Sequence, residues 1–367
     1  MRPITGTLTK ELNDILTHKE AAKADAFVVT SYSKLMDYIS RLSYLNKDYL
    51  LFFRGQGADY TNKAGASSIY PSIYRGDRLS RDELDIRFEV LTGSSRRLVD
   101  VMQKEKPEGY LDVKRRKYIQ WSILQHYEVC QTPLLDMTHS LRVACSFAFL
   151  SNSESDPYLY VFGLPYLTNR ISVNSEHDIV NVRLLNICPP DALRPYYQEG
   201  YLVGTDDITT DFDSKDELDF NNRLIAKFRL KRGKSFWGMG FRQIPETLLY
   251  PKKDWFKEIC SSIRTDVEEY GVGAVNLGRF LQEWADLENR IMSAARKYQD
   301  RVFSFREATL VLYKKQLLPY DLQKQLDELR NLRNFAVHEP SRLGTQDLTN
   351  AFKKVEDLKN QITKLLT

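Results

Sequence analysis

The pattern of apolar residues changes near residue 270, and this change constrains the fold of the 367-residue chain more than any other feature. Before it, short runs rich in aromatic and aliphatic residues, such as 49–53 and 158–162, alternate with helical stretches. After it, apolar residues recur at helical spacing, which predicts helices over 277–299, 304–316, 320–338 and 345–366. The pattern is typical of an α+β chain, with a mixed α/β N-terminal domain followed by an all-α bundle.

Three segments are predicted from this pattern. Residues 1–25 form a helical extension, because Leu8, Leu12, Ile15 and Leu16 fall on one helical face. Residues 26–268 form the mixed domain, and residues 269–367 form the helical domain. The Gly271-Val272-Gly273 sequence indicates a break between them.

Composition excludes several classes of protein. The four cysteines are scattered without ligand spacing, so neither a disulfide framework nor a metal site is predicted. No signal peptide and no run of eighteen apolar residues is visible, which favours a cytoplasmic protein without a membrane partner. The residues from Gly271 onward carry 16 Lys and Arg against 12 Asp and Glu, which accounts for the whole net charge of +4. This excess permits RNA binding without requiring it.

The N-terminal half contains four motifs in a distinctive order. They are Phe53-Arg54-Gly55-Gln56, the segment 69–75, Gln125-His126-Tyr127 with the following 132–148, and the segment 194–201. Together with 248–251 they resemble the FRG domain over about residues 30–260. The chain departs from that family at 128–133, where the family usually has Gly-x-Pro-Thr.

The motif order of an FRG domain is similar to that of ADP-ribosyltransferases, and this resemblance implies an NAD or related nucleotide site. Arg54 would hold the pyrophosphate with its fork of donors, and Thr138 would support the ribose. A carboxylate would stabilise positive charge on the ribose as nicotinamide leaves. The candidate nucleotide-binding residues are Arg54, Gly55, Gln56, His126, Tyr127, Asp136, Thr138, Gln198 and Glu199.

Simpler interpretations of the same residues stay open. Gln198 and Glu199 are predicted on one strand, so only one of them would face the cleft. Asp136 and Thr138 would also suit the cap of a helix beginning near Ser140. His126 would equally suit a protein core. The domain is then a nucleotide sensor without turnover, or a protein-recognition module.

The C-terminal helices contain a second motif, in which Arg333-Asn334 precedes His338 by four residues. Arg333 can grip a phosphate, and the imidazole of His338 can exchange a proton near neutral pH. The motif resembles that of the HEPN superfamily, many members of which are metal-independent ribonucleases that act as dimers. The resemblance implies Arg333, Asn334 and His338 as catalytic residues, with Glu288 in support. The alternative is a buried helical stripe whose Arg and His stabilise the C-terminal dipole.

These features lead to one functional hypothesis and two alternatives. The first is a toxin or phage-defence effector, whose HEPN domain cuts RNA as a homodimer and whose FRG domain binds or uses NAD. An antitoxin or a phage component would then be its partner. The second is an ADP-ribosyltransferase whose HEPN domain only dimerises or binds the target. The third is a non-catalytic sensing or interaction protein.

Overall fold

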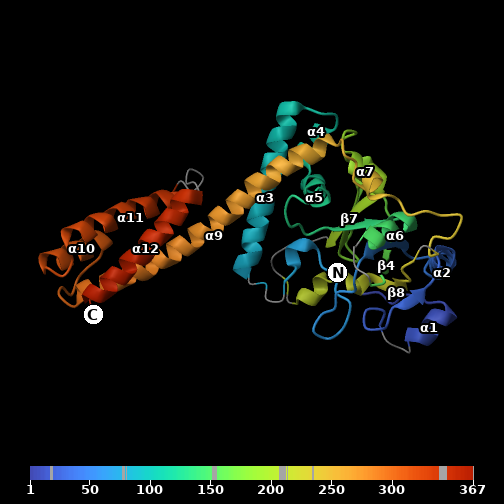
Figure 1. Ribbon diagram of the computed structural model, residues 1–367, viewed down its shortest axis with the longest axis horizontal. Helices are drawn as coiled ribbons and strands as arrows, with labels where there is room; N and C mark the ends of the chain where they lie inside the picture. The colour runs from blue at the N-terminus through green and yellow to red at the C-terminus, as the bar shows by residue number, and fades with distance from the viewer. Residues whose placement is uncertain are drawn as a thin grey trace. The chain divides into compact units, whose positions relative to one another are not determined.

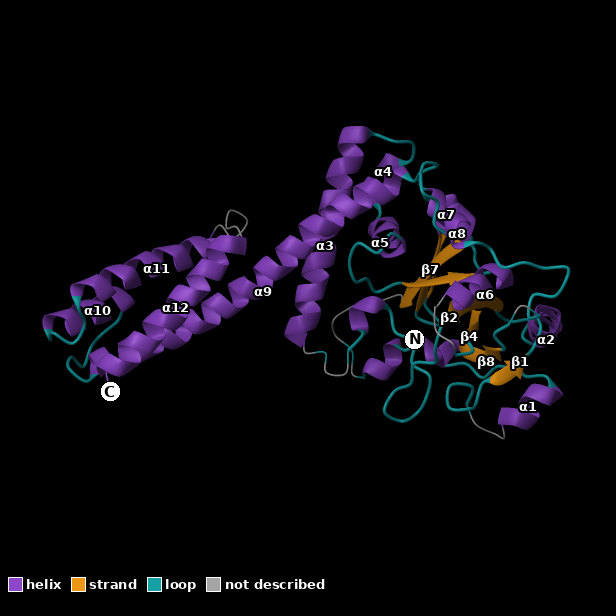
Figure 2. Cartoon of the chain, in the orientation of Figure 1, coloured by secondary structure: helices purple, strands orange, loops and turns teal. Residues whose placement is uncertain are grey.

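The computed structural model describes residues 1–16, 20–76, 79, 81–150, 155–205, 212, 214–233, 235–338 and 345–366 (Figures 1 and 2). The chain divides into two compact units, Met1–Arg264 and Thr265–Thr367. Unit 1 contains strands and helices, and unit 2 contains only helices in its described part (Figure 2). A mixed α/β architecture is therefore confirmed for the N-terminal part of the chain.

Unit 1 is built on one eight-stranded sheet with the order β1-β8-β4-β2-β3-β7-β6-β5. Its strands are β1 Phe27–Val29, β2 Leu50–Gln56, β3 Leu135–Thr138, β4 Tyr158–Leu164, β5 Ile171–Asn174, β6 Ile179–Arg183, β7 Gly200–Thr205 and β8 Leu224–Leu230. β1 pairs with β8 in parallel, and the other neighbours are antiparallel. Side chains alternate between the two faces, so Phe52 enters one apolar core and Phe53 the other.

Helices cover the sheet, and short 3₁₀ turns join it to the loops (Figure 2). The helices are α1 Lys10–Leu16, α2 Tyr32–Leu45, α3 Arg81–Glu105, α4 Tyr110–Arg115, α5 Lys117–His126, α6 Leu141–Leu150, α7 Leu193–Gln198 and α8 Glu246–Leu249. α2 begins where the Ser31 side chain accepts from the amide of Lys34. Leu35 of α2 and Ala148 of α6 are buried in the same core cluster as Phe53, so both helices cover that face.

The N-terminal segment differs from the predicted helical extension. Among residues 1–16 and 20–25, which the structure describes, the helix covers Lys10–Leu16, and Phe27–Val29 already forms a strand. Leu12 is buried in the core beside α2, and Ile4 packs against the same cluster. Residues 1–16 thus add apolar side chains to the core of unit 1. Too few of them repeat at helical spacing to form an independent helix.

Unit 2 consists of the second part of α9 (Trp255–Arg296), α10 (Phe305–Lys314), α11 (Tyr320–His338) and α12 (Thr345–Leu366). Its core is formed by residues from all four helices, including Trp284, Leu312, Leu326 and Val355. The sequence predicts a break at Gly271-Val272-Gly273, but α9 continues through it. A glycine inside a helix lowers helix stability by about 1 kcal/mol relative to alanine. This cost does not end a helix of 42 residues. In the described part of the chain, no helix combines the length and apolarity that crossing a membrane requires.

β2 and α6 approach each other so closely at Gly55 that this position has no room for a side chain. A Cβ atom there would lie 1.9 Å from the carbonyl oxygen of Ala144 and 2.8 Å from the amide nitrogen of Ala148. Both are backbone atoms, so relief would require the strand or the helix to move. The glycine of the Phe-Arg-Gly motif thus fixes how α6 packs beside Arg54.

The Gly55→Ala substitution should therefore destabilise unit 1 by about 1–3 kcal/mol or more, because overpacking displaces backbone. Thermal unfolding followed by circular dichroism measures the effect. Gly93→Ala is the matched control, since a Cβ there meets nothing within 4 Å and the residue lies inside α3. We expect this control to gain about 0.5–1 kcal/mol. Equal melting temperatures for Gly55→Ala and the unsubstituted protein would contradict the packing argument.

Candidate functional site

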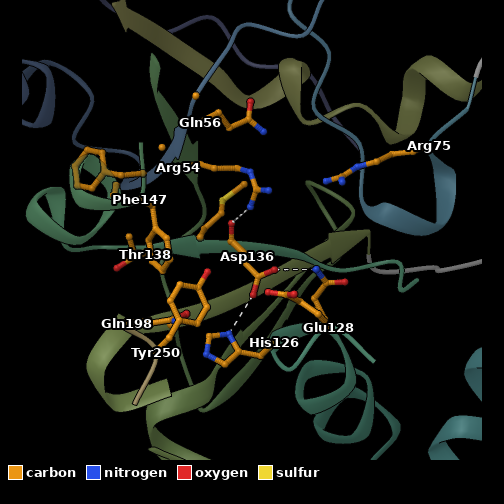
Figure 3. Close-up of a pocket in the computed structure, with 17 residues that line it drawn as sticks. Arg54, Gln56, Arg75, His126, Glu128, Asp136, Thr138, Phe147, Gln198 and Tyr250 are labelled. Carbon is orange, nitrogen blue, oxygen red and sulfur yellow. Dashed lines mark hydrogen bonds and ion pairs between the residues drawn. The ribbon is translucent and has the colours of Figure 1, made fainter. Parts of the chain in front are cut away.

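A cavity of about 410 Å³ opens at the ends of β2 and β3, beside the C-terminal end of α5 and the start of β7 (Figure 3). It is lined by Phe53, Arg54, Gly55, Gln56, Gly57, Arg75, Gln125, His126, Glu128, Asp136, Met137, Thr138, Ala144, Phe147, Gln198, Gly200 and Tyr250. Seven of the nine nucleotide-site residues predicted from the sequence are in this set. Tyr127 and Glu199 are the two that are not.

The carboxylate of Asp136 bonds two neighbouring side chains in the cavity (Figure 3). Its Oδ1 lies 3.1 Å from Nδ1 of His126, and its Oδ2 accepts from Nε2 of Gln125 at 2.8 Å. Burial by itself would raise the pKa of Asp136. The hydrogen bond and charge of His126, together with Arg54 and Gln125, outweigh burial and lower this pKa. Asp136 is therefore an anion at neutral pH. Its carboxylate oxygens bond Gln125 and His126, so this side chain does not cap α6.

Two guanidinium groups extend into the same space from different segments (Figure 3). Arg54, on β2, donates from Nη1 to the backbone oxygen of Asp136 at 2.5 Å, and its buried Nε has no hydrogen-bond partner among the described residues. Arg75, which follows a 3₁₀ turn at Ser72–Tyr74, donates from Nε to the carbonyl of Tyr70 at 3.1 Å. Burial lowers the pKa of both arginines, and the attraction of Asp136 offsets only part of that effect.

Thr138 and Gln198 serve to hold the walls of the cavity. Thr138 Oγ1 donates to the carbonyl of Glu199 at 3.0 Å and accepts from the amide of Ser140 at 3.1 Å. The capping interpretation therefore describes Thr138 in part. Gln198 donates from Nε2 to the carbonyl of Leu249 at 2.8 Å, which fixes the chain just before Tyr250.

The strand predicted for Gln198 and Glu199 is wrong. Gln198 is the last residue of α7, and Glu199 has φ +46 before β7 begins at Gly200. A left-handed residue turns the chain sharply, so the alternation rule for strands does not apply here. Glu199 is exposed and outside the cavity, which leaves Asp136 and Glu128 as the carboxylates of the lining.

Tyr127 faces away from the cavity and joins α5 to the start of α9. Its hydroxyl lies 2.9 and 3.1 Å from the two carboxylate oxygens of Asp254, and the side chain is buried. Burial and the neighbouring Asp254 raise the pKa of this hydroxyl well above its usual range. The next residue, Glu128, has φ +56, at the point where the sequence departs from the glycine of the FRG pattern. Glu128 thus adopts a left-handed conformation that glycine would adopt at lower cost.

Several lining residues were absent from the sequence prediction although they lie in or beside the predicted motifs. Arg75 closes the 69–75 segment, Gln125 precedes His126, and Tyr250 belongs to 248–251. Phe147 and Tyr250 form an aromatic wall, with ring centroids 5.9 Å apart. These residues lie within the sequence motifs, but only the fold shows which side of each segment faces the cavity.

The second predicted site lies on α11 of unit 2. Arg333 donates from Nη1 to Oδ1 of Asn334 at 3.1 Å, and Asn334 is exposed. The backbone of His338 ends the helix, while its side chain lies outside the described residues. Glu288, on α9, accepts from Nε1 of Trp284 at 3.0 Å. Where the structure describes the side chains, no three His, Cys, Asp or Glu residues gather as metal ligands would.

Comparison with protein families supports the N-terminal motifs. Residues 50–157 match the FRG domain model. The match spans β2, β3 and the motifs that supply Arg54, His126 and Asp136 to the cavity. Curated proteins and solved structures yielded no match to the chain. The FRG resemblance is thus confirmed over this segment, while the ADP-ribosyltransferase and HEPN resemblances stay predictions.

Replacing Tyr127 with Phe tests whether this residue is structural. The variant loses the donor to the buried Asp254 and should be destabilised by about 1–3 kcal/mol, since a buried carboxylate is left with fewer partners. Binding of NAD to the folded variant should equal that of the unsubstituted protein. Chemical denaturation and calorimetric titration measure the two quantities. A large loss of affinity at unchanged stability would show that Tyr127 contacts the ligand after all.

Proposed function

We propose that unit 1 binds NAD or a related nucleotide, with the phosphates held between Arg54 and Arg75. The observation that carries this proposal is the convergence of two guanidinium groups on one cavity from separate segments (Figure 3). Guanidinium groups bind phosphate oxygens through paired hydrogen bonds, so two of them suit a diphosphate.

The charge balance of the cavity supports an anionic ligand. Glu128 is 64% exposed and lies 3.9 Å from Arg194, and Asp136 is already engaged by Gln125 and His126. Arg54 is partly buried, and its lowered pKa means that the cost of burying this cation is not fully offset by its neighbours. A phosphate would supply the missing negative charge.

The shape of the site supports a ligand with two ends. A second cavity, of about 960 Å³, shares Arg54, Gln56, Gly57 and Arg75 with the first. The arginines therefore stand at the junction of two spaces. The first space has the aromatic wall of Phe147 and Tyr250, and the second is bordered by Tyr60 and Tyr70. Aromatic rings on both sides of a phosphate-binding junction suit the two heterocycles of a dinucleotide.

We also propose, as a second function, that unit 2 is a HEPN ribonuclease that acts as a dimer in a defence or toxin system. The supporting observation is the burial pattern of α11. Leu322, Leu326, Leu329 and Ala336 are buried in the bundle, whereas Asn334 is exposed and Val337 is 45% exposed. The apolar stripe thus accounts for one face of α11, and the motif residue Asn334 lies on another.

The Arg54→Gln substitution tests the nucleotide site. Loss of one charge-assisted hydrogen-bonding group costs about 1.5–3 kcal/mol, so the affinity for NAD and for ADP-ribose should fall by roughly 10- to 100-fold. Isothermal titration calorimetry on the full chain measures it. Arg229→Gln, an exposed arginine of β8 outside the cavity, is the matched control and should bind normally. Absence of NAD and ADP-ribose binding by the unsubstituted protein would refute the proposal.

Substitutions on α11 test the ribonuclease. Arg333→Gln and His338→Ala should each reduce RNA cleavage at least 100-fold, since each removes a group that handles the phosphate or the proton. Gel analysis of purified protein incubated with total RNA in EDTA measures it. Arg330→Gln is the matched control, because Arg330 lies 3.6 Å from Asp327 on the same helix. Equal RNA decay in all four proteins would leave unit 2 without a nuclease role.

A further inference from the structure

We propose that His126 acts as a general base in the cavity, where it takes a proton from a water molecule that attacks the ribose of the bound nucleotide. Asp136 is the residue that positions His126 for this step. The inference rests on the proposed nucleotide binding and adds a reaction to it, the hydrolysis of NAD.

The tautomer of His126 follows from its partner. An ionised carboxylate can only accept hydrogen bonds, so the 3.1 Å contact with Oδ1 of Asp136 requires the proton of the neutral imidazole to be on Nδ1. The other ring nitrogen, Nε2, then carries a lone pair. A carboxylate behind a histidine in this arrangement both orients the ring and stabilises the imidazolium that forms.

Gln125 fixes the carboxylate in turn. Its Oε1 accepts from the hydroxyls of Thr132 at 2.6 Å and Ser72 at 3.1 Å, so its Nε2 must face Asp136. This amide donates to Oδ2 of Asp136 at 2.8 Å and leaves Oδ1 for His126. The two hydroxyls therefore orient Gln125, and both Gln125 and His126 donate to the carboxylate of Asp136.

The free nitrogen of His126 is buried and lacks a partner. His126 is only 6% exposed, it lines the cavity, and its Nε2 has no hydrogen-bond partner among the described residues. A buried acceptor without a donor is unfavourable, and a ligand hydroxyl or a water molecule would satisfy it. A histidine serving only the core would be expected to use both ring nitrogens.

Its surroundings favour water as the donor. Gly200 leaves room for the ring, since a Cβ atom at that position would lie 3.2 Å from Cε1 of His126. Nε2 has almost no accessible surface, so no donor larger than a water molecule would fit beside it, and that water would have to enter from the cavity that His126 lines. Thr138 is not an alternative nucleophile, because its hydroxyl already donates to the carbonyl of Glu199.

The reaction balances without a further reagent. The proton of water passes to Nε2 of His126, and the water oxygen forms a bond with the anomeric carbon of the ribose. The bond from that carbon to the pyridinium nitrogen breaks, and its electron pair leaves with nicotinamide. The products are ADP-ribose, nicotinamide and one proton, which His126 releases to solvent.

His126→Ala and Asp136→Asn are the decisive variants. In Asp136→Asn, the fixed amide of Gln125 attracts the new side-chain oxygen, so the new NH₂ group faces Nδ1 of His126. The ring must then accept at Nδ1 and carry its proton on Nε2, where it can no longer act as a base. His177→Gln is the matched control, since His177 is outside the cavity and bonds Arg223.

Three measurements on the full chain test the proposal. Nicotinamide release from NAD is followed by chromatography, ADP-ribose affinity by calorimetry, and the protonated ring nitrogen of His126 by ¹⁵N NMR. We expect both variants to release nicotinamide at least 100-fold more slowly, with ADP-ribose affinity within about threefold of the unsubstituted protein. NMR should place the proton on Nδ1 in the unsubstituted protein and on Nε2 in Asp136→Asn. The His177→Gln control should behave as the unsubstituted protein in all three.

The outcomes separate this inference from the proposed nucleotide binding. The role of His126 as a general base is refuted if the unsubstituted protein binds ADP-ribose but releases no nicotinamide. It is also refuted if His126→Ala hydrolyses NAD at the full rate. In both cases the proposed nucleotide binding stands. If the unsubstituted protein binds neither NAD nor ADP-ribose, both proposals fail together. A variant that does not fold is recognised by circular dichroism, and the other variant then decides.

Discussion

The cavity of unit 1 depends on one ionised carboxylate. Asp136 receives Gln125 and His126 of α5 on its side chain, and its backbone oxygen receives Arg54 of β2. One residue of β3 thus ties together the segments that supply most of the polar lining. The pairing of β3 with β2 through a single register position, Phe53 opposite Thr138, is too short to hold these strands by itself. Asp136 therefore connects β3 with α5 and β2 around the cavity.

The position of Arg54 is set by sterics on one face of β2 and by polar contacts on the other. Gly55 admits α6 against the strand, whereas Arg54 lies opposite Tyr160 in the neighbouring strand β4. The hydroxyl of Tyr160 donates to Asp59 at 2.8 Å, and Asp59 also receives the buried Lys227 at 2.9 Å. This ion pair anchors the loop that follows the Phe-Arg-Gly motif. A buried pair of this kind specifies geometry more than it adds stability, which suits a loop that borders a ligand site.

The sequence motifs identified residues that line one cavity, and sequence reasoning failed where the tertiary fold decides. The Phe-Arg-Gly motif together with the other ordered motifs led to Arg54, and residues 132–148 led to Asp136. The role of Tyr127 depended on Asp254, which lies 127 residues away and has no local signature. The helix-to-strand junction at Glu199 was missed because a non-glycine residue adopts a left-handed conformation there. Likewise, the glycines at 271 and 273 suggested a break, whereas α9 continues through them, because the cost of isolated glycines does not by itself end a long helix.

The distribution of charge in the cavity argues for a particular kind of ligand. Arg54 and Arg75 present positive charge at the junction of the two cavities, whereas Asp136 places negative charge beside His126 in the lining of the first cavity (Figure 3). NAD has the complementary polarity, with an anionic pyrophosphate in its middle and a cationic pyridinium at one end. A pyridinium ribose near Asp136 would have its developing positive charge stabilised as the bond breaks. Glu199, exposed and turned away by its positive φ, cannot provide this charge from where it lies. On the proposal that NAD binds here, Asp136 is the carboxylate that would stabilise this charge, and His126 is the base that would activate the attacking water.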